Sequence, residues 1–366
     1  MPQAAVQPTI LRRADYFNSL ANHAQRAKPG DSLAVATMDF DPSDPLVRNF
    51  LHQAMAAAQR GVQVYCLIDA YSLMLTKHFT PGPLLYATSS DAPAGPIHRR
   101  LLKTLDALRA AGIHVAILNK PAGAWNNPFA GRSHIKFAVH NRTAWLGGCN
   151  LTDHRQVDLM AQFDHGKTAA YFLDLARRAV ATDQPLMHQL IGGRDYTIQI
   201  SNDYRLLIDA GTPHQSIIYD QALQLIAQAK SYVVITCQLF PNGKTADYLK
   251  AAQARGLAVS IIFNHPFKHP FPFNIIHPAV TAYEELGSPR HFFDHQLPLF
   301  HPYIHAKALL TDAGSIIGSH NFLPSGVAFG TAEAALFTRR SDFAHQVYDC
   351  LQTSVRKPLP SLPVPS

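Results

Sequence analysis

The sequence predicts an α/β protein built from two pseudo-symmetric halves, each an α/β/α sandwich in which a mixed β-sheet is flanked by helices. Three observations lead to this prediction. A segment at 133–150 recurs at 304–321. Apolar runs typical of buried strands alternate with amphipathic helical segments such as 45–61. The chain has 366 residues, of which 47% are hydrophobic, enough for two domains of ordinary size.

The two repeated segments align without a gap. The first reads SHIKFAVHNRTAWLGGCN and the second reads IHAKALLTDAGSIIGSHN. Matching residues stand 171 positions apart, namely His134 with His305, Lys136 with Lys307, Asn141 with Asp312, Gly147 with Gly318, and Asn150 with Asn321. Each segment is expected to form an apolar strand, a tight turn and a returning strand.

The similarity extends upstream of the motifs. Arg60-Gly61 and Arg255-Gly256, 195 positions apart, each separate a helical segment from an apolar strand. The two offsets differ by 24, so the first half holds 24 extra residues, which we place in the Ser/Pro/Gly/Ala-rich stretch 87–96 and expect to form a surface loop.

Segments 32–40 and 231–240 predict the first strand of each repeat. The glycines in 191–197 suggest the division into a first half at 1–192 and a second half at 193–366, and the Pro-rich tail 357–366 is expected to lack regular structure.

Composition narrows the class of protein. There are 32 Lys and Arg against 25 Asp and Glu, a net charge of +7, which favours an anionic partner. No apolar run reaches the roughly 18 residues that span a bilayer, and no signal-peptide pattern stands at the start. The four cysteines are scattered, as expected of reduced thiols in a cytoplasmic protein.

The motif residues suit the chemistry of phosphate. His134 and Lys136 are two positions apart and are expected on one face of a strand, as are His305 and Lys307. Two copies could supply two imidazoles, two ammonium groups and the amides of Asn150 and Asn321 to one cleft. Lysine cannot bind a metal while protonated, so the pattern favours phosphoryl transfer with no metal and no cofactor. A single His-x-Lys would fit an ordinary core histidine, but two copies at a constant offset do not.

These residues resemble the signature of the phospholipase D superfamily, HxKxxxxD followed by a Gly-Ser-x-Asn-like turn. The second motif fits it through His305, Lys307 and Asp312 together with the turn 318–321, and the resemblance covers nearly the whole chain. Both copies have a spacer one residue shorter than the family pattern before the glycine, and Asn141 stands where the family has Asp.

The resemblance implies a phospholipase D-like fold and a covalent phosphohistidine mechanism. It assigns the nucleophile to His134 and the acid/base to His305. Orienting carboxylates are expected after each Asn turn, and the candidates are Asp158 and Glu333. Which acid serves which histidine stays open at this point. The residues expected to support the motifs are Asn141, Asp312, Gly148 and Ser319.

Three kinds of activity remain open. The first is a phosphodiesterase or phosphatidyltransferase acting on phospholipids, similar to cardiolipin synthases; the others are a nuclease of the same superfamily and a non-catalytic module that binds phosphate or lipid. Nucleic acid is the less favoured substrate because charged residues make up only 16% and no basic run occurs.

Two stretches rich in phenylalanine favour a lipid substrate. The stretch 264–278 has four prolines, so we expect an irregular loop there, which could either touch a membrane interface or pack back on its own domain. The stretch 291–303 is expected to border the cleft. We expect a monomer, because both motifs lie in one chain. We also expect a cytoplasmic protein that could contact the inner face of the membrane peripherally.

Overall fold

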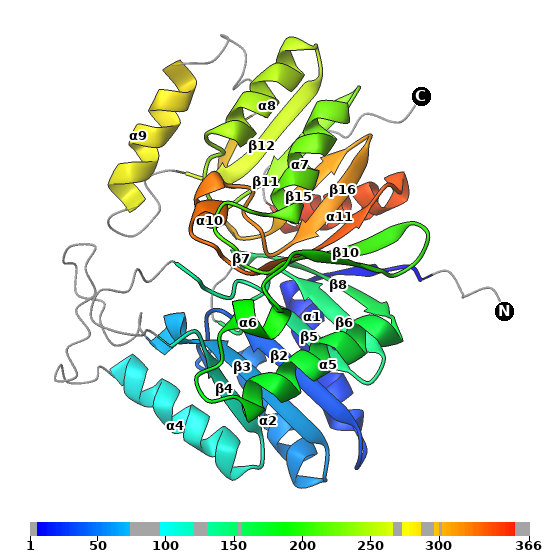
Figure 1. Cartoon of the computed structure of the whole chain (residues 1–366), viewed down its shortest axis with the longest axis vertical. Helices are drawn as coiled ribbons and strands as arrows, with labels where there is room; N and C mark the ends of the chain where they lie inside the picture. Colours follow the sequence, from blue (N-terminus) through cyan, green and yellow to red (C-terminus); the bar gives the residue numbers. More distant parts are fainter. Residues whose placement is uncertain are drawn as a thin grey trace.

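Two similar halves are stacked along the long axis of the molecule in a computed structural model (Figure 1). The structure describes residues 6–73, 96–120, 130–152, 156–265, 273–286, 296–299 and 302–355. The loop expected at 87–96, apart from Pro96, and the tail 357–366 lie outside these residues, as does most of 291–303.

The first half contains one large sheet and its helices. Its strands are β1 (Thr9–Arg12), β2 (Ser32–Thr37), β3 (Gln63–Asp69), β4 (His114–Leu118), β5 (Phe137–His140), β6 (Thr143–Gly147), β7 (Gln156–Val157) and β8 (Leu159–Asp164). Its helices are α1 (Arg13–Arg26), α2 (Pro45–Gln59), α4 (Pro96–Ala110), α5 (Gly166–Ala181) and α6 (Met187–Ile191).

The second half repeats this order. Its strands are β9 (Tyr196–Gln199), β10 (Tyr204–Asp209), β11 (Tyr232–Thr236), β12 (Ala258–Asn264), β13 (Gln296–Leu299), β14 (Tyr303–Ile304), β15 (Lys307–Thr311), β16 (Gly314–Gly318) and β17 (Glu333–Thr338). Its helices are α7 (Ile217–Gln228), α8 (Lys244–Ala254), α9 (Phe273–Leu286), α10 (Pro324–Ala328) and α11 (Ser341–Ser354).

The two large sheets have the same topology. The first runs β1-β8-β6-β5-β2-β3-β4, and the second runs β9-β10-β17-β16-β15-β11-β12-β13, with β9 as an additional edge strand. Strand β2 pairs in parallel with β3 and antiparallel with β5, and β11 pairs in parallel with β12 and antiparallel with β15, so both sheets are mixed. The predicted fold class is confirmed. The boundary at 192/193 stays a prediction; it falls between the end of α6 and the start of β9.

The repeated Arg-Gly pairs have a structural cause. The Arg60 guanidinium donates to the Ala24, Gln25 and Ala27 carbonyls at the end of α1. Arg255 does the same for α7 through the carbonyls of Ile226 and Ala229. Cations are favourable at helix C-termini because they offset the partial negative charge of the unpaired carbonyls.

After each of these arginines the backbone turns through a glycine with positive φ, +94° at Gly61 and +87° at Gly256, a conformation in which a side chain would be strained.

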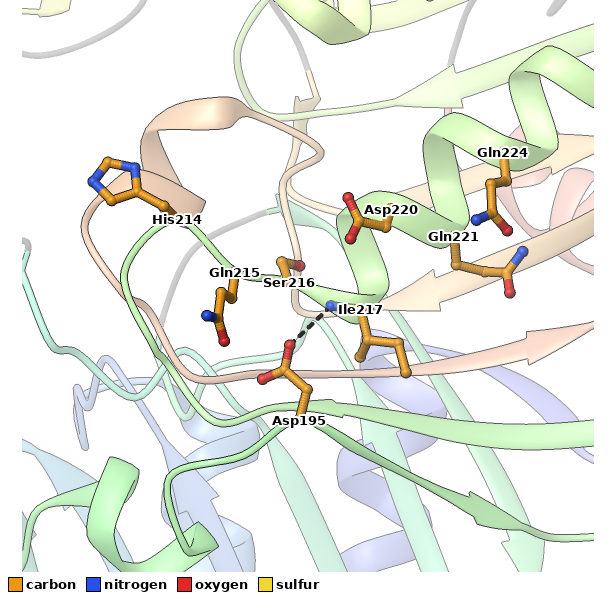
Figure 2. A pocket seen from close by; sticks show the side chains of 8 residues that line it. All are labelled: Asp195, His214, Gln215, Ser216, Ile217, Asp220, Gln221 and Gln224. Carbon is orange, nitrogen blue, oxygen red and sulfur yellow. Dashed lines mark hydrogen bonds between the residues drawn. The ribbon is translucent and has the colours of Figure 1, made fainter.

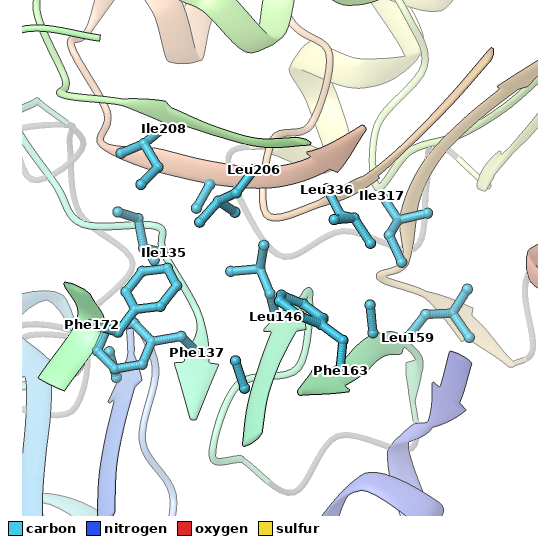
Figure 3. Packing of buried hydrophobic residues seen from close by; sticks show 14 of the residues in the cluster. Ile135, Phe137, Leu146, Leu159, Phe163, Phe172, Leu206, Ile208, Ile317 and Leu336 are labelled. Carbon is cyan, nitrogen blue, oxygen red and sulfur yellow. The ribbon is translucent and has the colours of Figure 1, made fainter. Parts of the chain in front are cut away.

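Three apolar cores hold the layers together. One lies between the first sheet and helices α1, α2 and α4, and another lies between the second sheet and α7 and α8. The third and largest contains residues of both sheets together with α5 and α11. Figure 3 shows Phe137 and Leu146 of the first half facing Leu206 and Leu336 of the second. The halves therefore share a core and should unfold together.

One sequence expectation is wrong. The stretch 264–278 was expected to be irregular throughout because of its prolines, but α9 begins at Phe273 and contains Pro278. Because Pro278 stands early in the helix, it removes a single backbone hydrogen bond, back to the first turn, and later turns form without it. Residues 266–272 lie outside the described part of the chain. Among the helices of the described residues, none is long and apolar enough to span a bilayer.

We predict that Leu336→Ala, in the second half, lowers the free energy of unfolding reported by the first half. Leu336 is fully buried in the shared core, and truncation of such a leucine costs about 2–5 kcal/mol. Both tryptophans of the chain precede residue 192, so urea unfolding followed by tryptophan fluorescence reports the first half. Leu102→Ala, on the exposed face of α4, is the control and should change little. An unshifted fluorescence midpoint in L336A would show that the halves unfold independently.

Candidate active site

The motif segments of the two halves meet at a junction of backbone hydrogen bonds. Ile304 pairs in parallel with Val157, where β14 meets β7, and Ser133 forms a parallel bridge with Ala332. Each contact lies one residue before a motif histidine and one residue before a candidate acid. The backbone N–H of His134 donates to Ala332 O at 2.8 Å, and that of His305 donates to Val157 O at 2.9 Å. Each half therefore holds the histidine of the other.

The carboxylates are exchanged between the halves in the same way. His134 Nδ1 lies 3.0 Å from Glu333 Oε1, and His305 Nδ1 lies 2.6 Å from Asp158 Oδ2. All four side chains are buried. These two contacts pair Glu333 with His134 and Asp158 with His305, a pairing that the sequence left open. With Nδ1 engaged, Nε2 is the ring atom left for chemistry on a ligand.

Burial keeps both imidazoles neutral at physiological pH. The pKa of His134 lies well below its ordinary value because of burial and then the Lys136 and Lys307 ammonium groups. For His305, burial followed by Lys307 lowers the pKa to about 3, although Asp158 opposes the shift. The Lys307 charge thus acts on the histidines of both motifs, which are parts of one electrostatic site.

The two motif lysines are also buried and close enough to repel each other. Burial and then Lys307 lower the pKa of Lys136 to about 7, and burial lowers the pKa of Lys307 to about 8. The ammonium of Lys136 donates to His134 O at 2.6 Å, and Lys307 donates to His305 O. The sequence placed both His-x-Lys pairs within strands, but β5 begins at Phe137 and β15 begins at Lys307, because the preceding residues pair with the opposite half instead.

The two motif asparagines differ in their contacts. Asn150 Oδ1 accepts hydrogen bonds from the Asp39 backbone N–H at 3.2 Å and from Thr37 Oγ1 at 3.3 Å, at the end of β2. Asn321 Oδ1 is enclosed and has no hydrogen-bond partner among the described residues. Buried polar atoms normally have partners, so an unsatisfied amide beside the motif marks a place for a ligand.

The turn residues after each motif make the two half-sites unequal. A Cβ at Gly148 would lie 2.1 Å from Asp158 Oδ1, so only glycine fits there. Ser319 occupies the equivalent position and donates its hydroxyl to Glu333. Burial raises the pKa of Glu333. Burial also acts to raise that of Asp158, but the His305 contact and Lys307 outweigh it and lower the pKa.

Asn141 and Asp312 serve the fold rather than the ligand site. Asn141 Oδ1 accepts the Ser32 backbone N–H at 3.4 Å, where β2 begins. The Asp312 carboxylate accepts the N–H groups of Lys230 and Ser231 just before β11. An amide oxygen and a carboxylate thus accept backbone N–H groups at equivalent places in the two halves. Asparagine also tolerates the positive φ of +52° that Asn141 has in the turn.

Two residues outside the predicted site, one in each half, position the motif histidines. Asp69, fully buried at the end of β3, accepts the Ser133 backbone N–H at 2.8 Å and pairs with Arg132 at 3.3 Å. Asn264 ends β12 and accepts the Ile304 backbone N–H at 2.7 Å. Each therefore holds the residue just before a motif histidine. The signal was present, because these residues end the matched strands at the offset of 195.

The pocket in Figure 2, of about 460 Å³, is separate from the motifs. It lies at the start of α7, where the Asp195 carboxylate accepts the Ile217 N–H at 3.0 Å, and none of the motif residues lines it. Among the described residues, no group of three His, Cys, Asp or Glu side chains is arranged to hold a metal ion.

Comparisons with known proteins concern the second half and the fold. Residues 222–353 match the family described as "Cardiolipin synthase, PLD-like domain". No curated protein sequence matches the chain. The crystal structure of phosphatidylserine synthase from Haemophilus influenzae Rd KW20 is similar with a TM-score of 0.70 at 13% identity, over 97% of this chain and 87% of that one.

Polyphosphate kinase from Porphyromonas gingivalis is similar with a TM-score of 0.56 at 12% identity, over 94% of this chain and 46% of that one. These likenesses concern the fold. The family match covers residues 222–353, which contain the second motif.

We predict that Asp69→Asn lowers the free energy of unfolding by about 3–5 kcal/mol, because it leaves the Arg132 guanidinium buried without its counter-charge. The second half has Asn264 and Tyr303 at the equivalent positions. The double variant Asp69→Asn/Arg132→Tyr copies that pair and should recover much of the loss in urea unfolding. A double variant less stable than D69N alone would show that the buried charge is not the cause.

Proposed function

We propose that the protein cleaves or transfers the phosphodiester of a phospholipid through a phosphohistidine intermediate, in the manner of a cardiolipin synthase-like phosphatidyltransferase. The observation that supports this most strongly is the exchanged pair of contacts His134–Glu333 and His305–Asp158. It puts two buried, neutral, oriented imidazoles beside two lysines within one site. A nucleophile and a proton donor are the two groups that displacement at phosphorus requires.

In the first step, His134 Nε2 attacks phosphorus, the P–N bond forms and the bond to the leaving oxygen breaks. Protonated His305 gives its Nε2 proton to that oxygen. In the second step, water or an alcohol attacks phosphorus and gives its proton to His305, while the P–N bond breaks and restores neutral His134. Protons and charge balance over the cycle. The same residues act whether water or an alcohol accepts the phosphoryl group.

The lysines and asparagines bind the phosphate. Lys136 and Lys307 have lowered pKa values because they are buried and near each other. An anionic phosphodiester between them reverses this effect and favours both ammonium forms, since opposite charges stabilise each other in a buried site. The same negative charge favours the protonated His305 that the first step needs. The side-chain amides of Asn150 and Asn321 complete the cradle, since their Nδ2 groups can donate to phosphate oxygens.

The unequal acids support the assignment of roles. Asp158, with its lowered pKa, stays ionised and contacts His305 at 2.6 Å, so it stabilises an imidazolium there. Glu333 shares its charge with the Ser319 hydroxyl and has a raised pKa, so it orients His134 with less pull on a proton. A neutral nucleophile at His134 and a proton carrier at His305 follow from this difference. One chain supplies both half-sites, which fits a monomer.

We predict that His305→Asn accumulates a covalent adduct on His134, because attack can occur but the proton carrier is missing, whereas His134→Asn gives none. The soluble phosphodiester bis-para-nitrophenyl phosphate serves as substrate, in EDTA, and mass spectrometry locates the adduct. Each variant should lose at least about a hundredfold in kcat, the usual range for general acid or base catalysis. His52→Asn, an exposed histidine on α2, is the matched control. An adduct on His305 would reverse the roles, and near wild-type kcat in either variant would end the single-site mechanism.

The substrate class is tested by incubating the protein with phosphatidylglycerol, phosphatidylcholine and single-stranded DNA. We predict turnover of phospholipid, detected by product lipid analysis, and little cleavage of DNA. Support comes from the printed descriptions of the matching family and of the phosphatidylserine synthase structure, and from a charged fraction of only 16% without basic runs. Preferential DNA cleavage would make the protein a nuclease, and binding of phospholipid without turnover would make it a binding module.

A further inference from the structure

Helices α4 and α9 occupy equivalent places in the two halves. Strands β3 and β4 are parallel neighbours, with α4 between them in the chain, and β12 and β13 are parallel neighbours with α9 between them. The chain leaves β3 at Asp69 and β12 at Asn264, the residues that position the two motifs. A crossover helix begins at the edge where its first strand ends. Each helix therefore follows a strand whose last residue positions a motif histidine.

Among the side chains of α9 that the structure describes, the buried ones are polar and the exposed ones are apolar. Its side chains Thr281 and Glu284 are buried, whereas Ile276, Ala279 and Tyr283 are exposed, Tyr283 at 74%. The spacing of these three, i, i+3 and i+7, places them on one face of the helix. An apolar face turned outward requires an explanation, because a helix packed on a sheet normally buries that face.

Polar contacts attach α9 to the protein. The Glu284 carboxylate pairs with Lys250 of α8 at 2.8 Å and accepts the Gly243 N–H at 3.0 Å. These contacts fix which face points inward. The outward apolar face is thus set by the structure and does not depend on loose packing of the helix.

Helix α4 adds positive charge to exposed apolar side chains. It buries Leu101, Leu105 and Leu108 against its sheet. Its outer surface exposes Ile97 at 59% and Leu102 at 41%, with Arg99, Arg100 and Lys103 also exposed, before the first acidic residue Asp106. Mixed basic and apolar side chains on one helical surface are typical of helices that lie in the interface of an anionic bilayer.

A further exposed apolar residue lies at the end of α10. Among the described residues, all the exposed large hydrophobic side chains belong to α4, α8 or α9 or flank α6 or α10. Phe329, which ends α10, accepts the Gly131 N–H, three residues before His134. Figure 1 shows α4, α9 and α10 along its left side, opposite the side on which the chain termini are marked.

We propose that this docking face, comprising Ile97, Arg100, Leu102 and Lys103 of α4 with Ile276, Ala279 and Tyr283 of α9, binds the surface of an anionic phospholipid bilayer. The inference rests on the proposed function, since a phospholipid substrate is held in such a bilayer. The positive charge of α4 complements anionic headgroups, and the apolar face of α9 enters the interface below them. Both helices follow strands that end at the residues positioning the two half-sites, so docking would bring the site toward the headgroup phosphates.

Cosedimentation with vesicles tests the docking face. Vesicles of phosphatidylcholine with phosphatidylglycerol are compared with vesicles of phosphatidylcholine alone. We predict that Arg100→Glu/Lys103→Glu weakens binding to the anionic vesicles by at least about tenfold, with little change on neutral ones. Ile276→Asp/Tyr283→Asp should weaken binding to both kinds of vesicle by about tenfold or more.

The control is Lys28→Glu, an exposed lysine before β2, at the opposite end of that strand from Thr37 and Asn150. It should bind within about twofold of wild type, because its charge is distant from the bilayer by more than the screening length. All variants should hydrolyse bis-para-nitrophenyl phosphate like the wild type, since this soluble substrate needs no membrane.

Wild-type protein that does not sediment with anionic vesicles, or variants that sediment equally with it, would overturn the docking face. A wild-type protein that binds vesicles but never turns over the soluble phosphodiester would instead overturn the proposed function and leave the docking face standing. The two failures are therefore distinct.

Discussion

Each half of this protein orients the histidine of the other half, and this exchange is the interaction on which the site depends. His134 contacts Glu333 and His305 contacts Asp158, and the backbone just before each of these residues pairs across the same junction. A half by itself would have an imidazole without its acid and an uncovered face of the shared core. The fold thus makes a single site from two motifs, and the large common core keeps the exchange in register.

The electrostatics of the site follow from the same arrangement. Burial lowers the pKa values of both histidines and both lysines and raises that of Glu333, so every shift but that of Asp158 disfavours charge. A buried site that disfavours its own cations favours an anionic ligand, since a phosphodiester would supply negative charge. Binding and activation are therefore linked: the proposed substrate creates the protonation states that its cleavage requires.

The places where the two halves differ are as informative as those where they agree. Gly148 offers no hydroxyl to Asp158, whereas Ser319 donates to Glu333, so the two imidazoles have unequal partners. Duplication supplies two of each group, but displacement at phosphorus needs one nucleophile and one acid. Small departures from symmetry can divide these roles without changing the fold. The outward apolar face of α9 is a further departure, and it concerns access to the site rather than its chemistry.

The sequence by itself determined the fold class, the repeat and the identity of the motif residues, because a constant offset between chemically matched residues is visible without coordinates. It did not determine which acid meets which histidine, since those contacts join residues 199 and 147 positions apart in the chain. It also failed at α9, where composition argued against a helix that the fold accommodates, and it passed over Asp69, whose role appears only where Arg132 and Ser133 reach it. Strand patterns depend on local periodicity, which sequence records. Contacts across the junction depend on how two sheets pack, and only the tertiary structure decides that.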